Sequence, residues 1–132
     1  DLEPCPGVIP VLQKLKDEGY SLALISSNHT ENLQAWLEHH QVHCFDWFEG
    51  TNGILLKHKS IRAQIRKHRL ERNRTLYLGD EARDIKAARH NRLKVVSVTW
   101  GLHSEQNLRG HSPDWLVNRP EELLDIVPKF LS

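Results

Sequence analysis

The fold is decided by the stretch Thr75-Leu76-Tyr77-Leu78-Gly79-Asp80-Glu81-Ala82-Arg83-Asp84-Ile85-Lys86-Ala87-Ala88. Its first four residues form a short, largely apolar run, which is typical of a strand buried on both faces. Gly79 and Asp80 end that strand, and a short helix is expected from Ala82 to Asn91. A buried strand followed at once by a helix is the repeating unit of a parallel α/β sheet.

The same alternation continues on both sides of this stretch. Further strands are expected at residues 21–26, 94–99 and 115–117, with a short strand or turn at 45–49. Helices are expected at 8–17, from about residue 30 through Leu37, from about Ser60, and from Pro120. The sequence therefore predicts an α/β fold with a doubly wound parallel sheet of Rossmann type.

Length and composition set limits on the class of protein. The chain has 132 residues, of which 39% are apolar and 27% charged, with a net charge of +1. This length predicts one domain spanning residues 1–132. The longest apolar runs fall far below the ~20 residues of a membrane helix. Two cysteines cannot build a disulfide framework, so we expect a cytoplasmic protein.

Polar residues stand where the predicted strands end, which is where parallel sheets bind ligands. Ser26, Ser27 and Asn28 follow the strand at 21–26. Asp80 and Asp84 follow the strand at 75–78, and their spacing of four residues puts them on one side of a helix start. Such carboxylates suit Mg²⁺, and hydroxyl and backbone N–H groups at a strand-to-helix turn can bind phosphate.

Two lysines, Lys57 and Lys59, precede the helix expected from Ser60 and could add positive charge beside a phosphate. Each of these features also has a simpler explanation as a helix cap, a turn or a solvated side chain. Only their order and spacing favour a phosphate and magnesium site. No residue of this set is an obvious nucleophile.

Three motifs resemble those of the haloacid dehalogenase superfamily, in its phosphoglycolate-phosphatase-like branch. They are Ile25-Ser26-Ser27-Asn28, then Lys57, then the run from Leu78 to Ala88 with its Gly-Asp-x-x-x-Asp pattern. The resemblance extends over essentially the whole chain. It implies a Mg²⁺-dependent phosphatase that acts on small phosphorylated metabolites through an aspartyl-phosphate.

The resemblance also assigns roles to individual residues. Ser26 would form a hydrogen bond with the transferring phosphoryl group, and Ser27 and Asn28 would contribute to substrate binding. Lys57, or Lys59 if the loop register differs, would neutralise charge on that group. Asp80 would ligate Mg²⁺, and Asp84 would ligate it or orient its waters.

The family's first motif, Asp-x-Asp-x-Thr after an apolar strand, is absent from these 132 residues. It supplies the nucleophile and the general acid/base, and its strand lies between the two strands that end at Ser26 and Gly79. We therefore expect an incomplete hydrolase core without its first strand and without a separate cap domain. Such a chain would be inactive alone, and marginally stable or self-associating through the missing-strand gap.

Other functions receive less support. Residues 57–74 hold eight Lys or Arg against one acid, Glu71, but no aromatic residue, so nucleic-acid binding is not favoured. The residues His39, His40, His43 and Cys44 match no standard zinc spacing. The main alternative to the phosphatase is a non-catalytic remnant that binds phosphate or a protein partner.

Overall fold

The computed structural model describes residues 7–26, 30–50, 57–100 and 105–131. The chain divides into two compact units, residues 1–55 and 56–132. All strand pairs within the two units are parallel, and helices connect them. The α/β prediction is confirmed, whereas the prediction of one domain over the whole chain stays a prediction.

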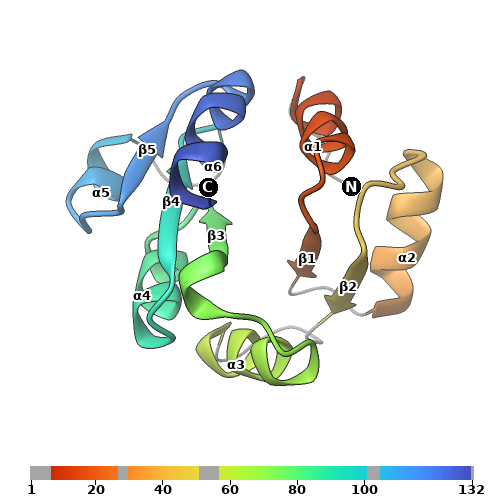
Figure 1. Ribbon diagram of the computed structural model, residues 1–132, viewed down its shortest axis with the longest axis horizontal. Helices are drawn as coiled ribbons and strands as arrows, with labels where there is room; N and C mark the ends of the chain where they lie inside the picture. The colour runs from red at the N-terminus through yellow and green to blue at the C-terminus, as the bar shows by residue number, and fades with distance from the viewer. Residues whose placement is uncertain (1–6, 27–29, 51–56, 101–104, 132) are drawn as a thin grey trace. The chain divides into compact units, whose positions relative to one another are not determined.

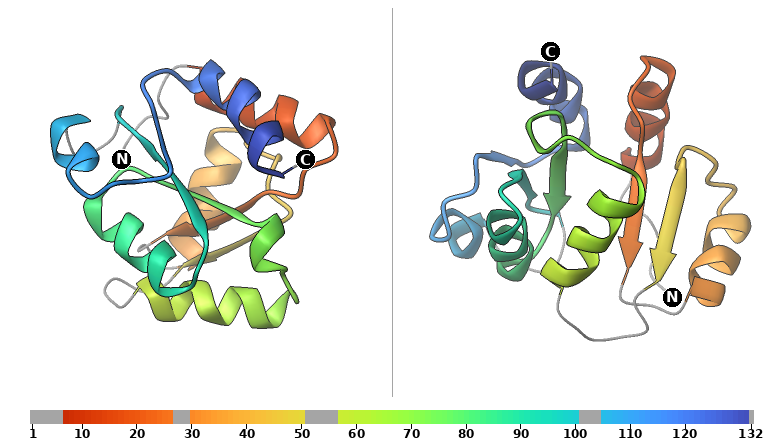
Figure 2. Two further views of the ribbon diagram at one scale, coloured as in Figure 1. Left: turned by 60° about the vertical axis from the view of Figure 1, so that its left-hand side comes forward. Right: turned by 60° about the horizontal axis from the view of Figure 1, so that its bottom comes forward.

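The first unit contains α1 (Val8–Asp17), β1 (Ala23–Ser26), α2 (Thr30–His39) and β2 (Trp47–Gly50). β1 and β2 lie side by side, with Ala23 opposite Trp47 and Ser26 opposite Gly50 (Figure 2). The core of this unit is formed by Leu33, Leu37, Val42 and Cys44, against which residues of α1 also pack.

The second unit contains α3 (Lys57–Lys67), a 3-10 turn η1 (Arg72–Arg74), β3 (Leu76–Gly79), α4 (Ala82–His90), β4 (Lys94–Val98), α5 (Glu105–Arg109), β5 (Trp115–Val117), a 3-10 turn η2 (Pro120–Glu122) and α6 (Leu123–Leu131). Its strands form one sheet in the order β3-β4-β5 (Figure 1). Leu76 lies opposite Lys94, and Val96 lies opposite Trp115.

β4 is the buried centre of this sheet. The four residues from Val95 to Val98 are all buried, as expected for a strand covered on both faces, and α4 and α6 lie on opposite sides of it (Figure 2). The residues of β3 are only half-buried. Within the described residues β3 pairs with β4 alone, so one of its edges lacks a neighbouring strand.

Two local expectations need correction. The helix expected from Ser60 begins at Lys57, so Lys57 and Lys59 lie inside α3 rather than before it. The apolar period of this helix begins only at Ile61, so its first turn carries no hydrophobic signal, although lysine is a good helix former. The short helix α5 was not expected, because its five residues are too few to show a period.

The described strands form two sheets, β1-β2 and β3-β4-β5. The expected self-association through a missing-strand gap stays a prediction. No helix in the described ranges is both long and apolar enough to span a membrane.

The same polar clamp fixes the strand register in each unit. An aspartate stands directly before β2 and before β5, and each is followed by tryptophan. The Asp46 carboxylate accepts a hydrogen bond from the Leu22 amide at 2.7 Å and pairs with Lys16 of α1. The Asp114 carboxylate accepts from the Val95 amide at 2.8 Å and from Arg89 of α4 at 2.6 Å.

In both clamps the aspartate's own backbone N–H bonds back to the same neighbouring residue, at 2.6 Å to Leu22 and 3.0 Å to Val95. The Asp46 clamp thereby connects the start of β2 to Leu22, just before β1, and to α1. The Asp114 clamp connects the start of β5 to β4 and to α4. Hydrogen bonds from Lys16 and the Leu22 amide lower the pKa of Asp46. Partial burial raises the pKa of Asp114, but hydrogen bonds from Arg89 and Val95 outweigh this and leave it lowered.

We expect Asp114→Ala to lower the free energy of unfolding by roughly 1–3 kcal/mol at pH 7, because the Val95 amide loses its acceptor. A carboxylate with a lowered pKa stabilises the fold above the pKa of its unfolded form, about 3.9, and the stabilisation disappears as pH falls further. Urea unfolding at a series of pH values measures both effects.

Asp125→Ala on the exposed side of α6 is the matched control and should change stability little. A deficit in Asp114→Ala that is as large at pH 3 as at pH 7 would show that the charge of Asp114 does not contribute.

Candidate active site

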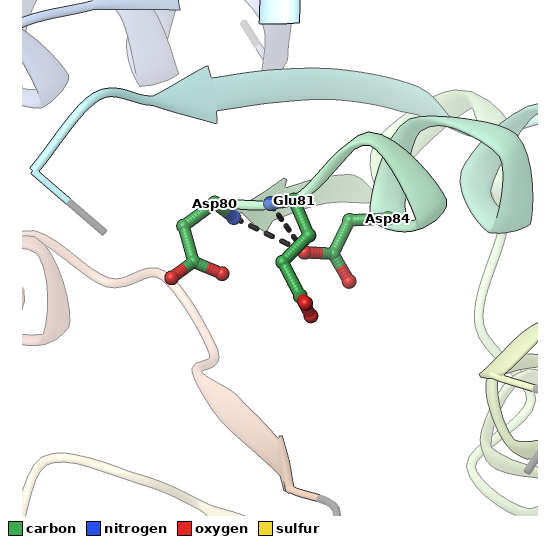
Figure 3. A group of neighbouring side chains, drawn as sticks. All are labelled: Asp80, Glu81 and Asp84. Carbon is green, nitrogen blue, oxygen red and sulfur yellow. Dashed lines mark hydrogen bonds between the residues drawn. The ribbon is translucent and has the colours of Figure 1, made fainter. Parts of the chain in front are cut away.

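Three carboxylates meet where β3 leads into α4. One ligand oxygen each from Asp80, Glu81 and Asp84 lies within 4.8 Å of the others (Figure 3). Asp80 and Glu81 are half-buried, whereas Asp84 is only 1% exposed. The cluster stands at the carboxyl end of a parallel strand, where ligands bind in sheets of this kind.

The Asp84 carboxylate holds the turn between β3 and α4. Its Oδ2 atom accepts hydrogen bonds from the backbone N–H groups of Asp80 at 3.1 Å and Glu81 at 3.0 Å (Figure 3). These N–H groups lie at the start of α4, where the helix itself offers them no acceptor. The negative charge is also favourable at a helix amino terminus. Burial of Asp84 is therefore offset by two hydrogen bonds and the helix dipole.

Gly79 makes this arrangement possible through close packing. A Cβ atom added to Gly79 would lie 2.4 Å from the Cβ and 2.5 Å from Oδ2 of Asp84. Any other residue at this position would push the Asp84 side chain away from the two backbone N–H groups. Only glycine, which has no Cβ atom, leaves room here for the Asp84 side chain.

Glu81 has a second charged partner in this turn. Its carboxylate accepts a hydrogen bond from Arg83 Nε at 2.9 Å, and this contact raises the pKa of Arg83. Part of the negative charge of the cluster is thus balanced within the protein. The carboxylate oxygens of this cluster are the hard ligands that Mg²⁺ prefers, so the residues present fit such an ion.

The structure brings together the two predicted metal residues, Asp80 and Asp84, and adds Glu81. Ser26 is the last residue of β1 in the first unit. Lys57 is the first residue of α3, and Lys59, two residues further into the helix, is exposed. Ser27 and Asn28 lie outside the described residues.

A histidine pair lies between α3 and α4 in the same unit. The rings of His58 and His90 are 4.4 Å apart, and the Asn91 side chain donates a hydrogen bond to the His58 carbonyl at 2.9 Å. Loss of hydration, then the charges of His90, Lys59 and Arg62, lowers the pKa of His58. The start of α3, which carries Lys57, is therefore anchored on α4, the helix that carries Asp84.

The histidine and cysteine residues near the end of α2 do not form a metal site in the described part of the chain. Only the acidic cluster at residues 80–84 brings three such side chains within reach of one ion there. Cys44 is buried in the core of the first unit, and burial raises the pKa of its thiol. Both observations agree with a structural role for these residues.

The sequence and the fold correspond to a known class of hydrolase. The profile of the haloacid dehalogenase-like hydrolases matches residues 1–98, and the chain belongs to this family. A phosphoglycolate phosphatase of Synechococcus elongatus is 32% identical over 131 residues, which cover 98% of this chain and 62% of that protein. A glyceraldehyde 3-phosphate phosphatase of Methanopyrus kandleri is 28% identical over 133 residues, covering 96% of this chain and 57% of that protein.

Solved structures show the same fold. The crystal structure of a predicted phosphatase from Clostridium acetobutylicum superimposes with a TM-score of 0.85 and 26% identity, covering 94% of this chain and 59% of that one. The chain thus spans little more than half the length of the proteins it resembles. The family and fold expected from the sequence motifs are confirmed.

Gly79→Ala is expected to destabilise the protein by roughly 1–3 kcal/mol, because the added methyl group overlaps Asp84 in a packed turn. Thermal and urea unfolding measure this cost. Gly110→Ala is the matched control, since its added Cβ would meet nothing closer than 3.4 Å. Equal stability of the two variants would contradict the proposed role of Gly79.

Proposed function

We propose that this chain forms part of the catalytic core of a Mg²⁺-dependent phosphatase that hydrolyses small phosphate monoesters. The observation that carries the proposal is the buried Asp84 carboxylate, which holds Asp80 and Glu81 at the end of β3 in a member of this hydrolase family. Relatives with this core include phosphatases for two different small metabolites, as their names state.

The acidic cluster would hold the metal ion. Asp80 would bind it directly, and Asp84 would bind it or orient its water ligands. Bound there, Mg²⁺ would supply a positive charge that stabilises phosphoryl oxygens in the transition state.

The phosphoryl group would be bound by residues at the carboxyl end of β1 and at the start of α3. The Ser26 hydroxyl would donate a hydrogen bond to a phosphoryl oxygen, and Ser27 and Asn28 would help to bind the substrate. Lys57 would provide a positive charge for the same group, with Lys59 as the alternative. Such preorganised donors lower the barrier to phosphoryl transfer without reorganisation of solvent.

The nucleophile must come from outside these 132 residues, because the sequence contains no Asp-x-Asp-x-Thr motif. In the reaction an aspartate oxygen would bond to phosphorus while the ester oxygen leaves as an alcohol, and water would then cleave the aspartyl-phosphate. We propose that the chain alone does not turn over substrate. With two cysteines and no disulfide framework, it would act in the cytoplasm.

A chimera tests this function: these residues replace the matched region of the Synechococcus elongatus phosphatase. We expect Mg²⁺-dependent phosphate release from small monoesters, abolished by EDTA and reduced at least about 100-fold by Asp80→Asn, because the charge that holds the ion is lost. Phosphate release with phosphoglycolate and other small phosphomonoesters measures the activity.

Asp125→Asn, an exposed aspartate of α6, is the control and should leave the rate unchanged. A folded chimera that binds Mg²⁺ without turnover would favour the non-catalytic phosphate-binding alternative. Turnover that is insensitive to EDTA and to Asp80→Asn would exclude the proposed metal site.

A further inference from the structure

The end of α4 meets α3 and the turn η1 at one junction of the second unit. α3 and α4 pack against each other (Figure 2). The rings of His58 in α3 and His90 in α4 are 4.4 Å apart. Arg72 Nε of η1 donates a hydrogen bond to the Asn91 carbonyl, just after α4, at 2.8 Å. These contacts bring cations of three chain segments to the same place.

Four arginine side chains surround this junction. Arg62 and Arg66 follow His58 at spacings of four residues, which puts them on the same side of α3 as the ring contact. Arg72 is bonded to the end of α4, and Arg92 follows two residues after that helix. All four are exposed, and none forms an ion pair with another described residue. Arg62, Arg66, Arg72 and Arg92 form the arginine cluster.

The charge of the chain is distributed unevenly around this cluster. Residues 57–94 hold 13 of the 18 Lys and Arg residues but only 4 of the 17 acidic residues. Three of these four acids form the carboxylate group at the start of α4, whereas the arginine cluster lies at the end of that helix. The two ends of α4 therefore carry opposite charge, and the arginine cluster lies in the positive region.

Helix ends alone do not account for the arginine cluster. Cations at a helix carboxyl terminus are favourable, which explains Arg92. Arg62 lies in the middle of α3, where the helix dipole gives no such stabilisation. Arg62 and Arg66 also form a like-charge pair at a spacing of four, which destabilises a helix. A bound anion would relieve this repulsion.

The surroundings of the cluster favour a phosphate backbone over a protein partner. Protein interfaces depend on buried aromatic or apolar anchors. The exposed large apolar side chain of the described residues is Trp115, which packs against Phe130 of α6, on the side of the sheet opposite α4. Residues 57–74 contain no aromatic side chain, which disfavours single strands, because their bases stack on aromatic rings. The phosphates of a duplex require only positive charge.

We propose that the arginine cluster is a docking surface for the phosphate backbone of a nucleic-acid duplex, bound without recognition of the bases. The planar guanidinium group of arginine can donate two parallel hydrogen bonds to a phosphate. The cations of η1 and of the end of α4 join those of α3 only in the folded unit, so the sequence of α3 alone understates this surface. The proposal is independent of the phosphatase activity.

Fluorescence anisotropy with a labelled DNA duplex of mixed sequence, titrated with the full chain at several salt concentrations, tests the proposal. Four phosphate contacts predict that the logarithm of the association constant falls by about 3 to 4 for each tenfold rise in salt. A second duplex of unrelated sequence should bind equally well. Absence of duplex binding at low salt, or a preference for one of the two duplexes, would overturn the proposal.

The variant Arg62→Gln/Arg66→Gln/Arg92→Gln removes three charges of the cluster and keeps the bond from Arg72. We expect affinity for the duplex to fall at least about 10-fold and the salt slope to decrease by about 2 to 3. The matched control, Lys14→Gln/Arg109→Gln/Arg119→Gln, removes three exposed charges elsewhere and should bind as the wild type does. Circular dichroism verifies that both variants are folded.

Competition experiments distinguish the duplex from other anionic partners. Poly-glutamate, a single-stranded DNA and vesicles containing phosphatidylserine should each displace the duplex less well than unlabelled duplex does. Stronger competition by any one of them would assign the surface to that partner and overturn the proposal. Equal loss of affinity in the two triple variants would show that net charge alone drives binding, and would also overturn it.

Discussion

The site depends on one buried carboxylate. Asp84 is 1% exposed, and two backbone N–H groups and the start of α4 surround its carboxylate. The same contacts set the path of the chain from β3 to α4, and that path decides where Asp80 and Glu81 point. Gly79 permits the approach because a Cβ there would overlap Asp84. The packing of Asp84 against Gly79 therefore supports both the turn and the candidate metal site, and a substitution of Asp84 or Gly79 affects both.

The sheet beneath this turn is held by a different device. In each unit an aspartate before the last paired strand bonds reciprocally to the neighbouring strand and to a cation of the preceding helix, Lys16 or Arg89. Such bonds fix the register of short strands, which few ladder bonds alone would leave weakly specified. β3 in turn pairs with β4 in a parallel register that places Gly79, at the base of the acidic turn, opposite Ser97.

Local sequence patterns predicted the order of strands and helices well, because unbroken apolar runs and glycine turns are local signals. The proximity of Asp80 and Asp84 was predicted from their spacing of four residues alone. Two features were beyond such patterns: the entry of Glu81 into the cluster and the Asp-Trp clamps. The clamps depend on which strand lies beside which strand and helix, and the spacing of residues along the chain does not contain that information. The start of α3 was misplaced because its first turn, Lys57 to Ser60, contains no apolar residue.

The central claim is that Asp84 builds the turn that presents Asp80 to a divalent cation. Anomalous diffraction from crystals soaked in Mn²⁺ tests it most directly. The account predicts a peak at a coordination distance of about 2.0–2.2 Å from the Asp80 carboxylate, with Asp84 Oδ2 still bonded to the N–H groups of Asp80 and Glu81. A peak away from this turn, or an Asp84 side chain rotated off the two N–H groups when the ion binds, would contradict it.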